Sequence, residues 1–180
     1  MMRENNIPLY ALESGDALTE FDILGFTMQY ELSYTNVLNM LELSGIPLRA
    51  ADRGEDFPIV IGGGPCAYNP EPVADFFDLF NIGEGEEMLP EIVRLYIKMK
   101  DEGRYTRADF LHEAARTISG VYVPSLTYPV YDENGAIVGF NGKKVETIRF
   151  EHLKAASEDV VDALPKFHFS FPTADTIKSA

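Results

Sequence analysis

The alternation of short apolar runs with amphipathic segments is the feature that most constrains the fold of this chain. Three runs have the length and composition of buried strands, and segments with helical spacing lie between and after them. The strand-like runs are Phe21–Thr27, Ile59–Ile61 and Leu79–Ile82. A strand–helix repeat of this kind predicts an α/β fold with a parallel sheet and right-handed crossovers.

The helical segments carry their own start and stop signals. Glu31–Ser44 has apolar residues at helical spacing and is followed by Gly45 and a proline. Glu86–Glu102 gathers acidic residues at its start and lysines at its end, as the helix dipole favours. Thr106–Ser119 begins with a residue whose hydroxyl can cap the first turn.

After about residue 120 the pattern changes to that of β-strands. Val121–Val123 and Thr127–Tyr131 are strand-like, and Ala136–Phe140 returns after the Asn134-Gly135 turn. Val145–Phe150 is a candidate third strand. We therefore expect a small antiparallel hairpin region after the last helix.

Composition excludes several classes of function. The chain has 180 residues and a formal net charge of −14, which argues against nucleic-acid partners and against docking on an anionic membrane. No apolar run approaches the roughly 20 residues that span a bilayer. Met1–Tyr10 lacks the basic and then apolar regions of a signal peptide. We expect a soluble cytoplasmic protein.

The cysteine count limits the chemistry of the chain. Cys66 is its only cysteine and the three histidines are far apart, so we predict no metal ligands. The chain also lacks the short motifs of zinc peptidases, P-loop nucleotide-binding proteins and serine hydrolases. We expect no catalytic residues and no complete catalytic site.

Ligands of open α/β sheets bind at the carboxyl ends of the strands. Three segments fall there, namely Thr27–Tyr30, Gly62–Pro65 and Gly83–Glu86. The glycines predict either a close approach of a flat ligand to the backbone or only a tight turn. The acidic residues beside Gly83 complement a helix dipole and repel phosphate.

Three segments, taken in order, resemble the N-terminal cobalamin-binding-type domain of an uncharacterised subfamily of radical SAM proteins. They are Phe21–Leu43, Pro58–Asp75 and Asp78–Glu87. In that subfamily a strand ends in glycine, a hydrophobic residue and Ser or Thr, a second strand ends in Gly-Gly-Pro, and a Gly-Glu-Gly-Glu turn follows.

The resemblance implies a flavodoxin-like fold with a cobalamin face at the strand ends. The implied cofactor-binding residues are Thr27, Met28, Gln29, Gly62, Gly63, Gly64, Pro65, Gly83, Glu84 and Gly85. It also implies a downstream catalytic domain, where a Cys-x-x-x-Cys-x-x-Cys motif binds an iron–sulfur cluster and S-adenosylmethionine. This chain lacks that motif.

The resemblance also suggests a domain organisation. We expect a flavodoxin-like cobalamin-binding-type domain over residues 1–104, truncated at its N-terminal side because its first strand and helix lie upstream of Met1. A helix and hairpin connector over residues 105–165 and a loose tail over 166–180 follow.

Three functional hypotheses stay open at this point. The first is a cobalamin-binding module that works with a radical SAM catalytic domain. The second is a cofactor-free interaction module that pairs through an exposed sheet edge, for example as a homodimer. The third, which the acidic charge and the missing phosphate loop disfavour, is a free-standing flavin or nucleotide enzyme.

Overall fold

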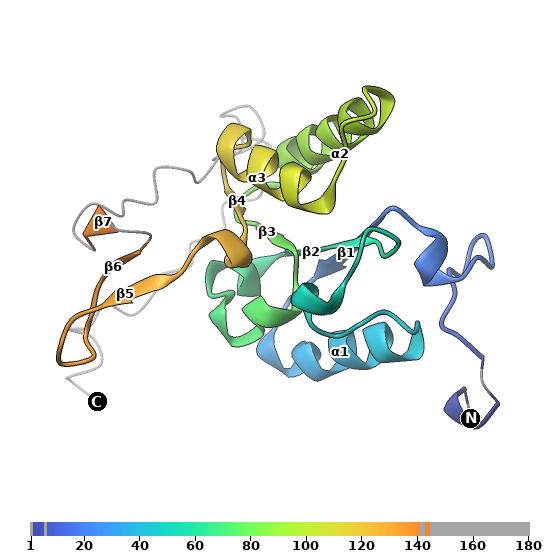
Figure 1. The fold of residues 1–180 in the computed structure, drawn as a ribbon. Coiled ribbons are helices and arrows are strands. Elements are labelled where there is room, and N and C mark those ends of the chain that lie inside the picture. The colour runs from blue at the N-terminus through green and yellow to red at the C-terminus, as the bar shows by residue number, and fades with distance from the viewer. Residues whose placement is uncertain (1, 6, 141–142, 145–180) are drawn as a thin grey trace, which may run out of the picture.

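The computed structural model describes residues 2–5, 7–140 and 143–144. Within this part of the chain, a sheet with the strand order β1-β2-β3-β4 forms the centre (Figure 1). Its strands are β1 (Ile23–Thr27), β2 (Ile59–Gly63), β3 (Leu79–Asn81) and β4 (Val121–Tyr122). The first three are parallel and β4 is antiparallel to β3, which confirms the predicted α/β fold.

Strand β4 corrects one expectation. The sequence pattern assigns residues 121–123 to the hairpin region, but Val121 lies opposite Asn81 in the main sheet. The N–H of Ile82 donates to the carbonyl of Gly120 at 2.9 Å and extends this pairing. The difference arises because the two preceding helices return the chain to the free edge of β3 in the opposite direction.

The three predicted helices are confirmed. They are α1 (Tyr34–Leu43), α2 (Gly85–Asp101) and α3 (Arg107–Thr117), and a short 3-10 turn over Glu31–Ser33 precedes α1. The Thr106 hydroxyl accepts a hydrogen bond from the Asp109 N–H at 3.1 Å, as expected of a cap. Figure 1 shows α1 on one face of the sheet and α2 with α3 on the other.

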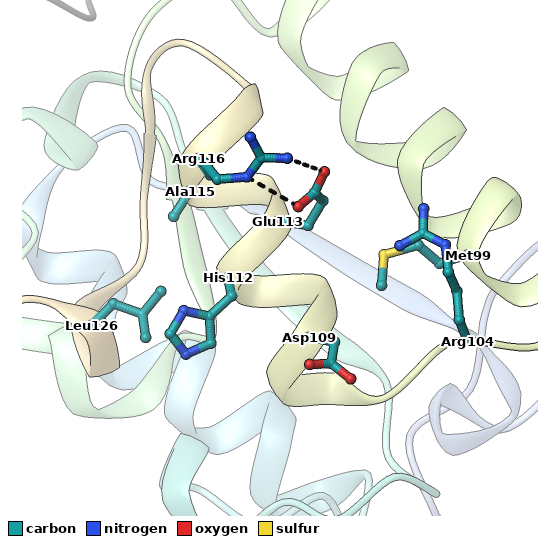
Figure 2. A pocket seen from close by; sticks show the side chains of 8 residues that line it. All are labelled: Met99, Arg104, Asp109, His112, Glu113, Ala115, Arg116 and Leu126. Atoms are coloured by element: carbon teal, nitrogen blue, oxygen red, sulfur yellow. Dashed lines mark hydrogen bonds and ion pairs between the residues drawn. The ribbon is translucent and has the colours of Figure 1, made fainter.

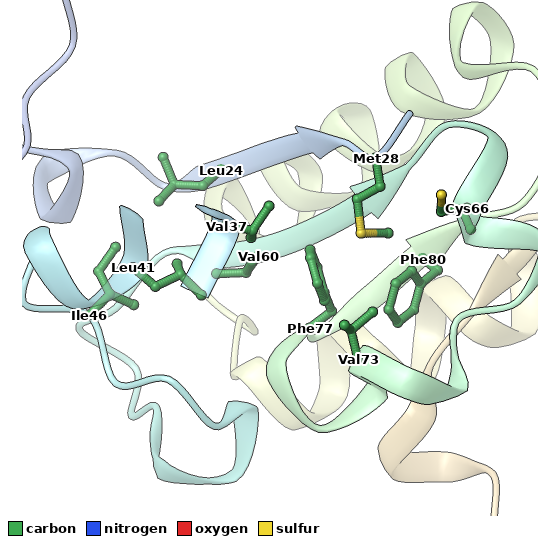
Figure 3. Close-up of a cluster of buried hydrophobic side chains, with 11 residues drawn as sticks. Leu24, Met28, Val37, Leu41, Ile46, Val60, Cys66, Val73, Phe77 and Phe80 are labelled. Atoms are coloured by element: carbon green, nitrogen blue, oxygen red, sulfur yellow. The ribbon is translucent and has the colours of Figure 1, made fainter. Parts of the chain in front are cut away.

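Two apolar clusters lie on the two faces, because successive side chains of a strand point to opposite sides. Val60 and Phe80 join α1 residues such as Leu41 in the first cluster (Figure 3). Ile61 and Leu79 join residues of α2 and α3 in the second. The sheet is therefore covered from both sides along its central strands.

A buried charged cluster closes the amino ends of the strands. Oδ2 of Asp78, directly before β3, accepts hydrogen bonds from Arg53 Nη1 at 2.9 Å and from the Val60 N–H at 2.8 Å. Arg107 Nε lies 3.4 Å from the other carboxylate oxygen. Burial lowers the pKa of the Arg53 guanidinium, and the charge of Asp78 opposes that shift. No local pattern in the sequence predicts this cluster.

A second, three-stranded antiparallel sheet follows. Its strands are β5 (Pro129–Tyr131), β6 (Ile137–Phe140) and β7 (Lys143–Lys144). The Asp132 carboxylate accepts from the N–H groups of Asn134 and Ala136, each at 2.8 Å, and shapes the predicted turn. The predicted strand over residues 145–150 and the predicted tail over 166–180 lie outside the described residues.

None of the helices in the described part of the chain has both the length and the apolar character needed to cross a bilayer.

Candidate functional site

The carboxyl ends of β1 and β2 are tied together by backbone hydrogen bonds. Thr27 lies opposite Gly63 in the parallel register. The Met28 N–H donates to the Gly63 carbonyl at 2.8 Å, and the Cys66 N–H donates to the Met28 carbonyl at 3.1 Å. The loops after the two strands therefore form one connected edge, as the sequence predicts.

A hollow of about 680 Å³ opens at this edge, between the strand ends and the start of α2. Six of the ten predicted site residues line it: Thr27, Gly63, Gly64, Gly83, Glu84 and Gly85. Gly25 and Asn81, which sequence analysis did not select, line it as well. The three predicted segments thus contribute to one hollow.

The other four predicted residues do not line the hollow. Met28 is fully buried in the cluster on the α1 face (Figure 3), whereas Gln29 and Pro65 are exposed. Gly62 faces the same cluster, since a Cβ there would lie 2.6 Å from Cδ1 of Phe80. These residues shape the core and the loops behind the strand ends.

The glycines after Ile61 have different structural roles. A Cβ added to Gly63 would meet only the Cβ of Asn81, at 4.0 Å, so this position has room for a side chain. Gly64 adopts a φ of +86°, a conformation that favours glycine. Gly63 is therefore the position of the three where the missing side chain leaves space open to a ligand.

Asn81, the last residue of β3, carries an unusual buried polar group. The residue is 7% exposed, and its Nδ2 donates to the Gly83 carbonyl at 3.3 Å. Its Oδ1 is buried and has no hydrogen-bond partner within the described residues. Such a group costs about 1–3 kcal/mol, so it calls for an explanation. In the sequence, the only indication that Asn81 belongs to a site is that this polar residue ends a short apolar run.

The start of α2 gives the hollow its electrostatic character. No side chain caps the first turn of α2, whose N–H groups point toward the strand ends. Glu84 and Glu86 also line the hollow, so acidic residues lie near these donors. Neutral acceptors can approach the N–H groups, whereas phosphate would meet negative charge.

The described residues contain no group of three or more His, Cys, Asp or Glu placed to hold a metal ion. Cys66 is buried, and the pKa of Tyr34 is raised, first by burial and then by its interaction with the Cys66 thiol. His112 lies on α3, away from the hollow. No cysteine or histidine is among the described residues that line the hollow.

Two other hollows lie elsewhere in the described part of the chain, and each contains an ion pair. Figure 2 shows the one beside α3, where Arg116 binds Glu113 at 2.7 Å. The other lies at the amino ends of the strands, beside Arg53 and Asp78, which bind each other. The hollow at the carboxyl ends, with its open glycines and the unpaired Asn81 oxygen, is the stronger candidate for a site.

Comparison with known proteins places this geometry in context. Residues 1–124 match a family described as radical SAM proteins, N-terminal. An uncharacterized protein of Methanocaldococcus jannaschii is 31% identical over 143 residues, which cover 74% of this chain and 29% of that protein. The chain thus spans less than a third of this relative. No solved structure matches.

Proposed function

The chain belongs to the family of radical SAM N-terminal domains, and from this membership we propose that it is a cofactor-binding module that acts beside a radical SAM catalytic domain. The observation that carries the proposal is the hollow at the carboxyl ends of the strands, where the three predicted segments meet. Ligands of open α/β sheets bind at this end of the sheet.

The catalytic cofactors of radical SAM proteins do not fit the residues of this chain. A thiolate-bound iron–sulfur cluster needs several cysteines, and the chain has one, which is buried. In this proposal the cluster and S-adenosylmethionine belong to the catalytic domain. This chain contributes binding and positioning.

Cobalamin is the cofactor that we propose for the hollow. The support is the ordered set of three motifs and a site with open glycines and an unpaired buried oxygen on Asn81. Thr27, Gly63, Gly64 and the turn over residues 83–85 would hold the corrin edge through backbone contacts, with the phosphodiester of the nucleotide tail away from Glu84 and Glu86. Bound cobalamin supplies a cobalt centre for group transfer, and no residue is proposed as its ligand.

The test is a cobalamin titration followed by gel filtration with visible absorbance. We expect colour to co-elute with the chain, and Gly63→Ala to abolish the co-elution because its methyl group enters the hollow. Gly54→Ala is the matched control, since a Cβ there also has room but lies outside the hollow. Colour that elutes apart from the wild-type chain would reject cobalamin.

A second candidate, pairing of two copies through a sheet edge, is favoured by the position of β1. This strand ends the sheet, and within the described residues no strand pairs with its outer edge. The Met28 N–H and the Asp22 carbonyl both bond to residues of β2. Because peptide groups alternate along a strand, the N–H of Gly25 points outward. This edge could therefore accept another strand.

Light scattering of two variants tests this pairing. Gly25→Pro removes an outward N–H and leaves the bonds to β2 intact, whereas Gly25→Ala keeps that N–H. A dimer that Gly25→Pro alone dissociates supports the second candidate. A wild-type monomer at high concentration would reject it.

A further inference from the structure

The unpaired oxygen of Asn81 needs a hydrogen-bond donor that the described residues do not supply. Its Nδ2 donates a hydrogen bond to the Gly83 carbonyl at 3.3 Å, whereas Oδ1 is buried without a partner among the described residues. Native structures rarely leave a buried polar atom unsatisfied. Asn81 is one of the residues that line the hollow, and the terminal torsion of asparagine is soft, so rotation of the carboxamide can bring the oxygen toward a bound group.

The start of α2 lies next to this side chain. A Cβ placed on Gly85, the first residue of α2, would lie 3.8 Å from Nδ2 of Asn81. The carboxamide is therefore beside the first turn of a 17-residue helix, and no side chain caps that turn. One acceptor and a set of backbone N–H donors thus share one wall of the hollow.

The remaining walls restrict the shape and charge of the ligand. Gly25 and Gly63 leave the sheet surface without side chains, which suits a flat group. Glu84 and Glu86 line the hollow near these donors, and their negative charge disfavours carboxylates and phosphates there. The group that fits is therefore flat and uncharged, and it carries a donor next to an acceptor.

We infer that Asn81 selects the ligand of this hollow by forming a hydrogen bond with a neutral, planar amide group. The Oδ1 of Asn81 accepts from the N–H of that amide, while the first turn of α2 donates to the amide oxygen. The inference rests on the proposed function, because it requires that the hollow holds a ligand. It adds the chemical class that the hollow recognises and names Asn81 as a specificity-determining residue.

The test uses benzamide and benzoate, which have the same shape and differ in charge and in the N–H donor. Titrations are followed by NMR on the isotope-labelled chain, with the Asn81 side-chain amide and the backbone N–H groups of α2 as reporters. We expect saturable shifts with benzamide and none with benzoate. Equal shifts with both probes, or no shift of Asn81 with benzamide, would overturn the inference.

A variant adds a second, independent readout. Asn81→Leu keeps the approximate size and removes the acceptor, so benzamide affinity should fall about tenfold, the value of one net hydrogen bond. Asn69→Leu is the matched control, at an exposed asparagine outside the hollow. Unchanged affinity in Asn81→Leu would contradict the inference, and the wild-type comparison of the two probes decides it even if that variant does not fold.

Cobalamin co-elution on the same samples separates the two proposals. Co-elution with both wild type and Asn81→Leu would support the cobalamin module and reject the selecting role of Asn81. Benzamide shifts at Asn81 without cobalamin binding would support the selecting role and reject cobalamin. The absence of both signals would reject both proposals.

Discussion

The hydroxyl of Tyr96 donates a hydrogen bond of 2.7 Å to Oδ1 of Asp22, which lies 74 positions earlier in the chain. The contact joins the middle of α2 to the residue that precedes β1. The ring of Tyr96 also packs edge-on against Phe110 of α3, with centroids 5.5 Å apart. One side chain thus links two helices to the amino end of the first strand.

Replacing Tyr96 by Phe should lower the free energy of unfolding by about 1–2 kcal/mol, because the ring stays packed and only the hydrogen bond to a carboxylate is lost. Urea denaturation followed by circular dichroism measures the change. Tyr131→Phe, on the exposed face of the hairpin, should leave the midpoint unchanged. Equal midpoints for Tyr96→Phe and wild type would contradict the prediction.

Tyr96 should also make the free energy of unfolding depend on pH in the alkaline range. Burial, and then the bond to Asp22, raises the pKa of Tyr96 well above its ordinary value of about 10. Above pH 10 the unfolded chain loses this proton while the folded chain keeps it, so stability falls as pH rises, by up to about 1.4 kcal/mol per pH unit. Tyr96→Phe lacks this loss, and its deficit against wild type should therefore shrink between pH 9 and pH 11. A constant difference would refute the assignment.

Asp78→Asn tests the buried charged cluster. The side chains of Asp78 and Arg53 are 1% and 0% exposed, so the variant leaves buried guanidinium groups without a counter-charge. We expect a loss of about 3–5 kcal/mol in the free energy of unfolding. Asp75→Asn is the matched control, because Asp75 pairs with Arg49 at the surface and should cost less than about 1 kcal/mol. Similar losses in the two variants would show that the cluster does not stabilise the fold.

Substitutions at the neighbouring Gly62 and Gly63 test stability and ligand binding separately. Gly62→Ala should lower stability by about 1–3 kcal/mol, because its methyl group would overlap the Phe80 ring. Gly63→Ala should keep the wild-type melting temperature and lose the ligand, because its methyl group fills the hollow. Thermal denaturation and cobalamin co-elution of both variants provide the two readouts. If Gly62→Ala instead lost cobalamin and Gly63→Ala lost stability, the site would lie on the other face of the sheet.

The sequence predicted the elements whose signals are local. Strands β1 to β3, the three helices and the Thr106 cap follow from periodicity, acidic helix starts and capping residues. Thr27 and Gly63 were assigned correctly to one edge because parallel strands bring their carboxyl ends together. For these features a few consecutive residues determine the outcome.

Features that depend on contacts across the chain were not predicted. The pairing of β4 with β3 depends on where two helices return the chain, which no local pattern records. Asp78 and Arg107 are 29 positions apart, so only the fold brings them together. Asn81 is also ordinary in sequence, and its unpaired oxygen becomes visible only when the buried atoms around it are known.

The charged cluster and the glycine hollow lie at opposite ends of the same strands. The amino end holds buried ion pairs whose loss we expect to destabilise the fold strongly, whereas at the carboxyl end Gly63 has room for a larger side chain. A substitution at Gly63 can therefore change the hollow at little thermodynamic penalty, whereas the positive φ of Gly64 favours glycine there. Evolution can retune such a module to a new small molecule without redesigning its scaffold, and protein engineers can do the same.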